Sequence, residues 1–375
     1  MLTSAMIKEA ARKAGADMCG IGPISRMAGA PDEMNPKFLF PEAKSIIGFV
    51  FRIPRGVQRG IEEGTQFYQY PSMAYGGINE ILAPACLYHV GKVIEDAGYE
   101  AFTYRNTGAR GCVSDMDGSV GATLSPEEQI EVNNNAKDAT AHHRSVEFTR
   151  ATRPGENVPP DLQFQFRLCA VACGLGEIGW SKMLLTPQFG PLQRVAFIFT
   201  DAELEYDEMY SGKPLCRRCG ACVRECPGHC IPPMNSGHDI VVDIDGKKCV
   251  WGDIDMWKCY AFYTHAGRYY NPFVPKEVFD RNENGNLNVL EGKCDASEKE
   301  IMKVYGALAK YFPSWVGYNM AKCGGCIRAC VSMLEKPGGC MSGRFKNPLR
   351  TRKQAWKMDR LGVGGRCRYA DKREN

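Results

Sequence analysis

The sequence has no long apolar run. The longest, SIIGFVF at residues 45–51, has the length of a single strand, so no transmembrane helix is expected. The chain opens MLTSAMIKEAARKAGAD, without the apolar stretch of a secretory signal peptide. Basic and acidic residues nearly balance, 47 against 43, so the overall charge gives no reason to expect nucleic-acid binding. These absences favour a globular protein, which we expect in the cytoplasm.

Cysteine, by contrast, is abundant. The 375 residues include eighteen cysteines, and 44% of the chain is hydrophobic, which is enough for two modest domains. Disulfides are rare in the reduced cytoplasm, so we interpret the cysteines as ligands rather than cross-links.

Five of these cysteines lie in CRRCGACVRECPGHC. Cys216, Cys219, Cys222 and Cys226 follow the pattern C-x2-C-x2-C-x3-C-P. In two-cluster ferredoxins the first three such thiolates hold one iron–sulfur cube and the fourth holds the other. A structural zinc site needs only four ligands, usually as two separated pairs, and leaves the third C-x2-C step unexplained. The motif therefore predicts iron–sulfur clusters.

A second motif, KCGGCIRACV, lies about a hundred residues further on and supplies the partner. The crossed arrangement predicts one [4Fe-4S] cluster on Cys216, Cys219, Cys222 and Cys330. The other cluster takes Cys226, Cys323 and Cys326 and lacks one ligand. Spacing alone leaves four candidates for that ligand: Cys230, Cys249, Cys259 and Cys294.

The first 200 residues alternate between helix and strand signals. Apolar spacing predicts a helix over residues 3–14 that ends at Gly15, and a buried helix over residues 80–98. Strands are predicted in ADMCGIGP, in KSIIGFVFRIP and at residues 195–200. The polar residues 105–160 indicate a long surface loop or a segment at a substrate site. This alternation is typical of an α/β domain.

A glycine loop precedes the last of these strands. Gly174, Gly176 and Gly179 satisfy G-x-G-x-x-G, with Asp201 about twenty residues later. A nicotinamide fingerprint should follow a strand, and the preceding FQFRLCAVAC is ambiguous between helix and strand. A loop whose backbone approaches another flat or phosphate-bearing cofactor is the favoured interpretation, and a tight turn without a ligand is the alternative.

Together these motifs resemble a known family. ACGLGEIGWSKMLLTPQFGPLQRVAFIFTD followed by the first cysteine motif is similar to the cobalamin-dependent iron–sulfur reductases, which include reductive dehalogenases and epoxyqueuosine reductase. IKEAARKAGADMCGIGPIS and PEAKSIIGFVF are also similar to that group. The resemblance implies an α+β protein with a nitroreductase-like α/β corrinoid-binding domain and then a ferredoxin-like domain with two [4Fe-4S] clusters. We expect these domains at 1–205 and 206–343, with an insertion near 264–318 and a basic tail at 344–375.

The resemblance also assigns site residues. In this family a W/R-x-C element supplies the missing cluster ligand, and MWKCYAFY matches it at Cys259, which leaves Cys230 as a spare. The glycine loop and the residues after it are implied to bind the corrinoid: Gly174, Leu175, Gly176, Gly179, Thr186 and Pro187. No D-x-H-x-x-G stretch occurs among the scattered histidines, so a histidine-ligated corrinoid is not expected.

The proton donor departs from the family pattern. Dehalogenases of this type use a tyrosine upstream of the glycine loop, and this chain has no tyrosine between Tyr104 and Tyr206. Epoxyqueuosine reductases use an aspartate there, and Asp161 lies near the corresponding place, although it would also serve as a helix N-cap. Glu177 inside the loop is the second candidate.

Two further features stand outside this scheme. DRNENGNLNVLE fits the EF-type pattern D-x-[DN]-x-[DN]-G-x5-E, and the predicted calcium ligands are Asp280, Asn282, Asn284, Asn286 and Glu291. Residues 344–375 carry eleven basic against three acidic residues, so this tail could dock an acidic ferredoxin or flavodoxin, or contact tRNA or an anionic membrane.

Three function classes follow. The first is a cobalamin-dependent reductase that cleaves a small, in some cases halogenated, molecule. The second is an epoxyqueuosine-type reductase that modifies tRNA. The third is an electron-transfer protein that binds no corrinoid.

Overall fold

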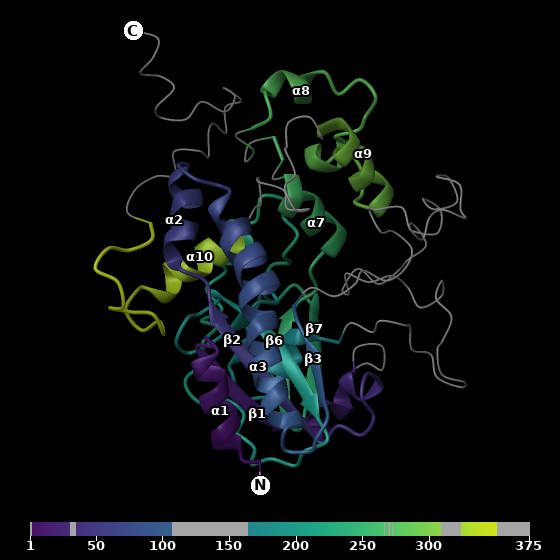
Figure 1. Cartoon of the computed structure of the whole chain (residues 1–375). Coiled ribbons are helices and arrows are strands. Elements are labelled where there is room, and N and C mark those ends of the chain that lie inside the picture. Colours follow the sequence, from purple (N-terminus) through teal and green to yellow (C-terminus); the bar gives the residue numbers. More distant parts are fainter. Residues whose placement is uncertain are drawn as a thin grey trace, which may run out of the picture.

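The structure is a computed structural model, and it describes residues 2–30, 35–106, 164–265, 267–268, 271, 273–308 and 324–350. Figure 1 shows the whole chain, with the first helix and strands in purple and the last described helix in yellow-green.

The centre of the fold is a four-stranded antiparallel sheet with the strand order β1-β2-β6-β3. The strands are β1 (Met18–Pro23), β2 (Ser45–Arg52), β3 (Ala101–Tyr104) and β6 (Gln193–Thr200). Ser45 faces Thr200 and Arg52 faces Gln193, so β2 and β6 pair over their whole length. The three strands predicted from the sequence are confirmed.

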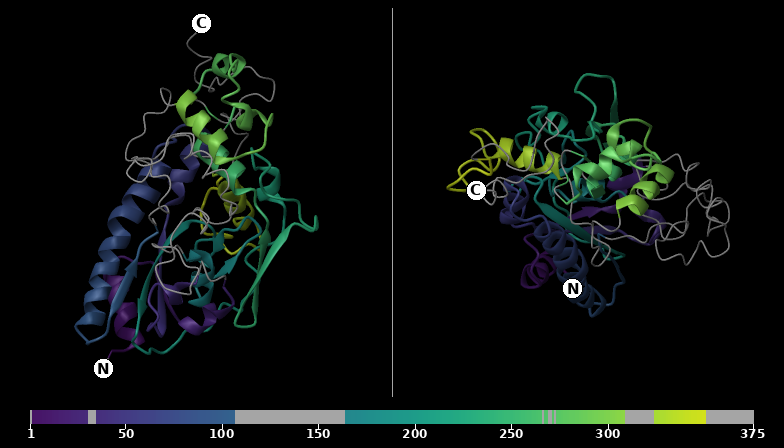
Figure 2. Two further views of the ribbon diagram at one scale, coloured as in Figure 1. Left: turned by 90° about the vertical axis from the view of Figure 1, so that its right-hand side faces the viewer. Right: turned by 90° about the horizontal axis from the view of Figure 1, so that it is seen from above.

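Two helices, α1 (Ser4–Lys13) and α3 (Ala83–Glu95), cover one face of this sheet (Figures 1 and 2). The predicted first helix is confirmed together with its signals, because the Thr3 hydroxyl accepts a hydrogen bond from the Met6 N–H at 3.3 Å. Gly15 follows the helix with a φ of +95°, a backbone conformation that favours glycine.

A helix and a hairpin cover the opposite face. They are α5 (Phe166–Ala172) and the antiparallel pair β7 (Asp239–Ile244) and β8 (Lys247–Gly252). Ile244, Cys249 and Trp251 of the hairpin are buried in the same core as α5. The hairpin therefore belongs to the core of the sheet although it follows the first cysteine motif.

The buried sheet explains the unbroken apolar run of β2. Ile47, Phe49 and Phe51 pack into the α1/α3 core, whereas Ile46 and Val50 pack into the core below α5. Alternate residues of a strand point to opposite faces, so a strand covered on both faces must be apolar throughout.

The predicted helix over residues 80–98 is confirmed only in part. Its regular portion begins at Ala83 with Pro84 in the first turn, where the missing N–H of proline leaves no hydrogen bond unmade. The residues before it form a π-helix, η4 (Pro71–Leu82). The shorter elements between the strands are η1 (Ile24–Gly29), η3 (Pro36–Phe38), β4 (Glu177–Ile178) and β5 (Leu184–Leu185).

The second half of the chain returns to the sheet through α10. This helix (Gly325–Leu334) lies beside α2 (Arg55–Glu63) and packs against the short α6 (Ala221–Arg224) (Figure 1). Several of its side chains, such as Val331 and Leu334, are buried in the α1/α3 core. The regions on either side of residue 205 therefore share hydrophobic cores, and the domain boundary there stays a prediction.

A smaller core lies at the other end of the molecule. It is built by α7 (Met256–His265), α8 (Lys276–Asp280), η7 (Asn288–Glu291) and α9 (Glu298–Leu308), of which α7–α9 are labelled towards the top of Figure 1. In the part of the chain that the structure describes, no helix has the length and apolar composition needed to span a membrane.

Candidate functional site

Four predicted ligands of one cluster gather where α6 meets α10. We call Cys216, Cys219, Cys222 and Cys330 the first thiol group. Burial raises the pKa of Cys222 to about 11, with further contributions from Cys216 and Cys219. Burial likewise raises the pKa of Cys330, and Cys216, Cys222 and Cys219 add to it. The structure thus brings Cys330 to the three cysteines of the first motif.

The loop that carries this group is tied to the glycine loop. The Cys216 N–H donates to Glu177 Oε1 at 2.7 Å, and the Trp180 N–H donates to Cys216 Sγ at 3.4 Å. Glu177 also belongs to β4, which pairs with β5. These contacts give Glu177 a positioning role at Cys216, and its role as a proton donor stays a prediction.

A second thiol group lies in an adjoining core around Trp180 and Ile254. It consists of Cys226, Cys230, Cys259 and Cys326. A hydrogen bond from the Cys230 thiol, helped by the Cys230 N–H at 3.3 Å from Cys226 Sγ, lowers the pKa of Cys226 to about 6. The same thiol lowers the pKa of Cys259. Cys230 therefore lies within hydrogen-bonding reach of both neighbours.

This arrangement narrows the candidates for the missing ligand. Cys249 is buried on β8 in the core below α5, and the exposed Cys294 lies beside Glu300, 3.7 Å from its Oε2. Of the four candidates, Cys230 and Cys259 lie in the core cluster that contains Cys226 and Cys326. Cys323 lies outside the described residues, and the choice of Cys259 over Cys230 stays a prediction.

The chemistry of the donor sets fits iron–sulfur clusters. Each of the fifteen described cysteines is free of disulfides. Among the described residues no three His, Cys, Asp or Glu side chains converge on a single metal ion. A [4Fe-4S] cluster is larger than one ion and takes one thiolate at each of its four iron atoms. The two groups supply separate thiols of this kind, in positions that range from the exposed Cys219 to the buried Cys226 and Cys230.

The glycine loop is packed against the chain itself. A Cβ atom at Gly176 would lie 2.0 Å from the Leu185 carbonyl oxygen, and one at Gly174 would lie 2.4 Å from that of Glu208. The Leu175 side chain is buried against Gly20 and Gly48. Close packing within the protein thus accounts for the glycines at 174 and 176. Contact with a corrinoid stays a prediction for them, for Leu175 and for Gly179.

The residues after the loop are also engaged within the fold. Thr186 is fully buried, and its hydroxyl accepts a hydrogen bond from the Phe189 N–H at 3.1 Å. Its backbone pairs with Gly190 in an isolated bridge, with half-buried Pro187 in the turn between them. Cys340 lies 4.0 Å from the Thr186 carbonyl oxygen and also contributes to the raised pKa of Cys330, so this turn lies near the first thiol group.

The nicotinamide alternative does not fit the local structure. The stretch before the glycines is the helix α5, whereas a dinucleotide fingerprint follows a strand and opens a helix. Asp201, the expected ribose ligand, accepts a hydrogen bond from the Glu100 N–H at 2.9 Å. Asp161 lies outside the described residues.

Sequence reasoning missed a cluster of aromatic and basic residues beside the second thiol group. We call Tyr70, Tyr75, Arg167 and Arg194 the Tyr–Arg cluster. The Arg194 guanidinium lies 4.0 Å from the Tyr75 ring centroid and donates to the Tyr70 hydroxyl at 3.3 Å and to the Ala74 carbonyl at 3.3 Å. It thereby joins strand β6 to the π-helix η4, a type of helix found frequently at functional sites.

The electrostatics of this cluster connect it to the cysteines. Burial and the like charge of Arg194 lower the pKa of Arg167, whereas Cys259 and Cys326 act on it in the opposite direction. Burial opposes the charge of Arg194 as well, but Tyr75 and Tyr70 outweigh that effect and raise its pKa. The cluster thus places the Arg167 guanidinium near Cys259 and Cys326 of the second thiol group. No sequence motif indicates this, because its members come from three separate elements.

The EF-type loop lies within the described residues, and several of its predicted calcium ligands contact other groups of the protein. Arg268 pairs with Asp280 and, at 3.4 Å, with Glu291, so one guanidinium bridges both carboxylates. Asn282 accepts a hydrogen bond from the Leu287 N–H at 3.0 Å. Gly285 has a φ of +68°, as the sharp turn requires. Calcium binding by this loop, with Asn284 and Asn286 as further ligands, stays a prediction.

Comparisons with known proteins point to one enzyme group. The chain is 29% identical over 157 residues to tetrachloroethene reductive dehalogenase of Desulfitobacterium hafniense, a match that covers 40% of this chain and 27% of the relative. It is 31% identical over 128 residues to the enzyme of the same name from Sulfurospirillum multivorans, covering 33% of this chain and 24% of the relative. The predicted resemblance is confirmed. The matched part spans about a quarter of these relatives' length.

Other comparisons are weaker. No family model matches the chain. Among solved structures, epoxyqueuosine reductase from Streptococcus thermophilus has 12% identity and a TM-score of 0.40, covering 88% of this chain and 80% of that one. A catabolic reductive dehalogenase in complex with 3-bromo-4-hydroxybenzoic acid has 16% identity and a TM-score of 0.41, covering 68% and 28%. Scores of this size carry no argument about function.

Proposed function

We propose that the chain is an oxidoreductase that passes electrons through two [4Fe-4S] clusters to a corrinoid and reductively cleaves a small, in some cases halogenated, organic substrate. The proposal is supported by the sequence similarity to reductive dehalogenases and by the two thiol groups. When bound, a corrinoid supplies a strongly reducing cobalt centre.

The observation that carries the proposal is the position of Cys330. It lies on α10, more than a hundred residues from the first motif, yet it joins Cys216, Cys219 and Cys222. The packing of α6 against α10 brings it there. Two interleaved cysteine motifs are typical of proteins that hold two clusters close together for electron transfer.

The Tyr–Arg cluster is the proposed place for proton delivery. Reductive cleavage of a carbon–halogen bond takes up two electrons and one proton and releases a halide ion. Tyr75 carries a hydroxyl proton and lies against Arg194, whose positive charge stabilises the phenolate left after proton transfer. We therefore add Tyr75 to Asp161 and Glu177 as a candidate donor.

The proposed electron transfer also requires a physiological electron donor. We propose a ferredoxin or flavodoxin as the electron donor, since low-potential clusters need a low-potential reductant. The basic tail at 344–375 is the proposed docking segment, and only residues 344–350 of it are described. A reduced, cytoplasmic setting suits oxygen-sensitive thiolate ligands.

An anaerobic preparation tests the function. Protein reconstituted with iron, sulfide and cobalamin should contain about eight iron atoms and one corrinoid per chain and should show cluster and cob(II)alamin spectra. Reduced protein should release halide from a panel of small organohalides. Clusters without corrinoid binding would favour the electron-transfer alternative, and activity only on epoxyqueuosine-containing tRNA would favour the second alternative.

A further inference from the structure

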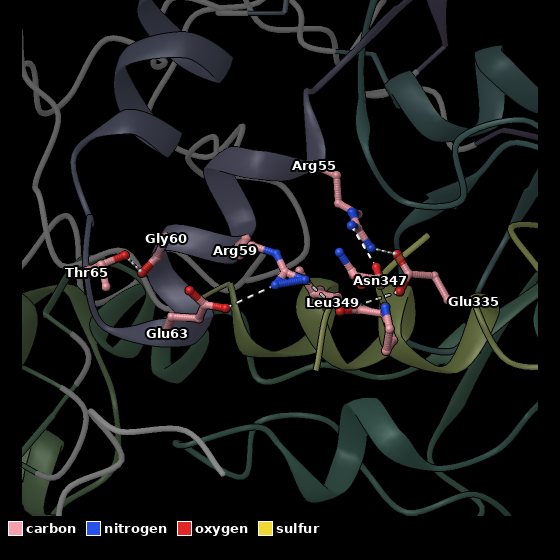
Figure 3. A network of polar contacts seen from close by, with 9 residues as sticks. Arg55, Arg59, Gly60, Glu63, Thr65, Glu335, Asn347 and Leu349 are labelled. Atoms are coloured by element: carbon pink, nitrogen blue, oxygen red, sulfur yellow. Dashed lines mark hydrogen bonds and ion pairs between the residues drawn. The ribbon is translucent and has the colours of Figure 1, made fainter. Parts of the chain in front are cut away.

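Helix α2 is clamped against the segment that carries the second cysteine motif. Arg55 pairs with Glu335 at 2.6 Å and donates to the Asn347 carbonyl at 2.9 Å, and Arg59 donates to the Pro348 carbonyl at 2.7 Å (Figure 3). The Glu335 carboxylate also accepts a hydrogen bond from the Leu349 N–H at 2.7 Å. These contacts fix α2 along α10 and the residues that follow it.

A buried ion pair fixes the inner side of the same two helices. Glu62 Oε2 accepts from Arg328 Nε at 2.9 Å, and the side chains are 3% and 2% exposed. Gln58 precedes Glu62 by one helical turn on α2, so it lies on the same side of the helix. Gln58 is 0% exposed.

The Gln58 amide has no hydrogen-bond partner among the residues that the structure describes. Neither its Nε2 nor its Oε1 atom is bonded, although both are buried. Leaving a buried amide unpaired costs about 1–3 kcal/mol, so native proteins pair such groups with protein, water or a ligand. Glu62, one turn further on, has its charge fully paired by Arg328 and Arg350.

The unpaired Gln58 amide lies beside the second cysteine motif. Its Oε1 lies 3.9 Å from the position that a Cβ atom at Gly324 would take. Gly324 is the N-cap of α10, with a φ of +52°, and it stands between Cys323 and Cys326 in the chain. A half-turn of the amide exchanges Nε2 and Oε1, so the donor group can face the motif.

We propose that the Gln58 side chain donates an N–H···S hydrogen bond to the cluster held by Cys326 and raises the reduction potential of that cluster. The inference rests on the proposed function, since it needs the cluster to be present. A reduced cluster carries more negative charge on its sulfur atoms, and a hydrogen-bond donor stabilises that charge. Gln58 is a positioning and tuning residue, because it contacts the electron carrier and not the substrate.

Potentiometric titration followed by electron paramagnetic resonance tests this role. Gln58→Leu removes the donor and puts a shorter apolar side chain in the buried site. One of the two clusters should become about tenfold harder to reduce, which is about 59 mV lower for one electron. Gln69→Leu makes the same change at an exposed position and should leave both potentials at their wild-type values.

The readouts separate failure of the inference from failure of the function. Wild-type protein without clusters would overturn both. Full iron content with two unshifted potentials in Gln58→Leu would overturn only the inference and would leave a buried water as the partner of the amide. Gln58→Met is the second variant, since its flexible side chain fills the site if leucine packs poorly. The same lowered potential in Gln58→Met confirms the role.

Discussion

Glu62 on α2 and Arg328 on α10 form an ion pair of 2.9 Å in the interior of the protein, 266 residues apart in the sequence. Arg350 pairs with the other carboxylate oxygen of Glu62 and reaches Glu225 at 3.3 Å, next to Cys226 of the first motif. One buried carboxylate thus links the N-terminal region to both cysteine motifs.

Removing that carboxylate should destabilise the protein strongly. Glu62→Ala removes the carboxylate that pairs with the buried Arg328 guanidinium, and breaking a buried ion pair costs about 3–5 kcal/mol. Glu63→Ala on the same helix breaks a partly exposed pair with Arg59 and should cost less than about 1 kcal/mol. Denaturant unfolding of both variants measures the difference. Equal losses of unfolding free energy in the two variants would show that the buried pair stabilises the protein no more than the partly exposed pair.

Cluster ligation should distinguish Cys259 from Cys230. Cys259→Ser should lower the iron content and weaken the signal of one cluster, whereas Cys230→Ser should keep about eight iron atoms. The two thiols lie side by side, so the variants are matched in position. Iron analysis and cluster spectra show which of the two thiols is the ligand. Loss of iron only in Cys230→Ser would make Cys230 the ligand instead of Cys259.

The proton donor should be revealed by removal of one hydroxyl group. Tyr75→Phe keeps the ring that stacks on Arg194 and should lower turnover by about 10²-fold, as expected for a lost general acid. Both clusters should persist. Tyr263→Phe, whose ring centroid lies 6.4 Å from that of Tyr75, is the control and should retain activity. Normal turnover in Tyr75→Phe would return attention to Asp161.

The glycine loop should respond to substitution through stability. In Gly176→Ala the new Cβ atom would lie 2.0 Å from the Leu185 carbonyl oxygen, so overpacking should cost at least about 1–3 kcal/mol. Gly56→Ala on α2 meets nothing within 4 Å and should stabilise the helix by about 0.5–1 kcal/mol. Thermal unfolding of the apoprotein should shift in opposite directions for the two variants. A Gly176→Ala protein of wild-type stability would contradict the packing account.

Acid should destabilise the small core at the end of α7. Burial lowers the pKa of His265 to about 4, from an ordinary value near 6.5. The unfolded chain binds a proton below about pH 6.5, whereas the folded chain resists it, so stability is complete above pH 6.5 and declines towards pH 4. The loss over this window is about 3 kcal/mol. His265→Gln should flatten the pH dependence of unfolding, and His89→Gln at an exposed position should not.

The grouping of the cysteines and the strands of the sheet could be predicted from the sequence. Cysteine spacing is a local property of the chain, so it identified Cys216, Cys219 and Cys222 as one set. The apolar run of β2 and the Thr3 cap of α1 are local signals too, and the structure confirms both elements.

The Tyr–Arg cluster and the Gln58 site could not be predicted from the sequence, because their residues lie far apart in the chain. Arg194 meets Tyr70 across 124 residues, and Gln58 meets Gly324 across an even longer separation. Such meetings depend on how helices pack on the sheet, which no local pattern encodes. A glycine needed for a cofactor and one needed for a neighbouring carbonyl have the same sequence signature, so the G-x-G-x-x-G pattern could not reveal the close packing of Gly176 against Leu185.

The sharing of the α1/α3 core has a consequence for biogenesis. Ile327, Val331, Leu334, Met341 and Leu349 complete a core whose other members, such as Ile7 and Phe49, leave the ribosome first. During synthesis the early residues therefore expose apolar surface until the last described segment has emerged, which prolongs the period in which the nascent chain needs protection from aggregation. The same late segment carries Cys326 and Cys330, so insertion of the proposed clusters would have to follow the synthesis of α10.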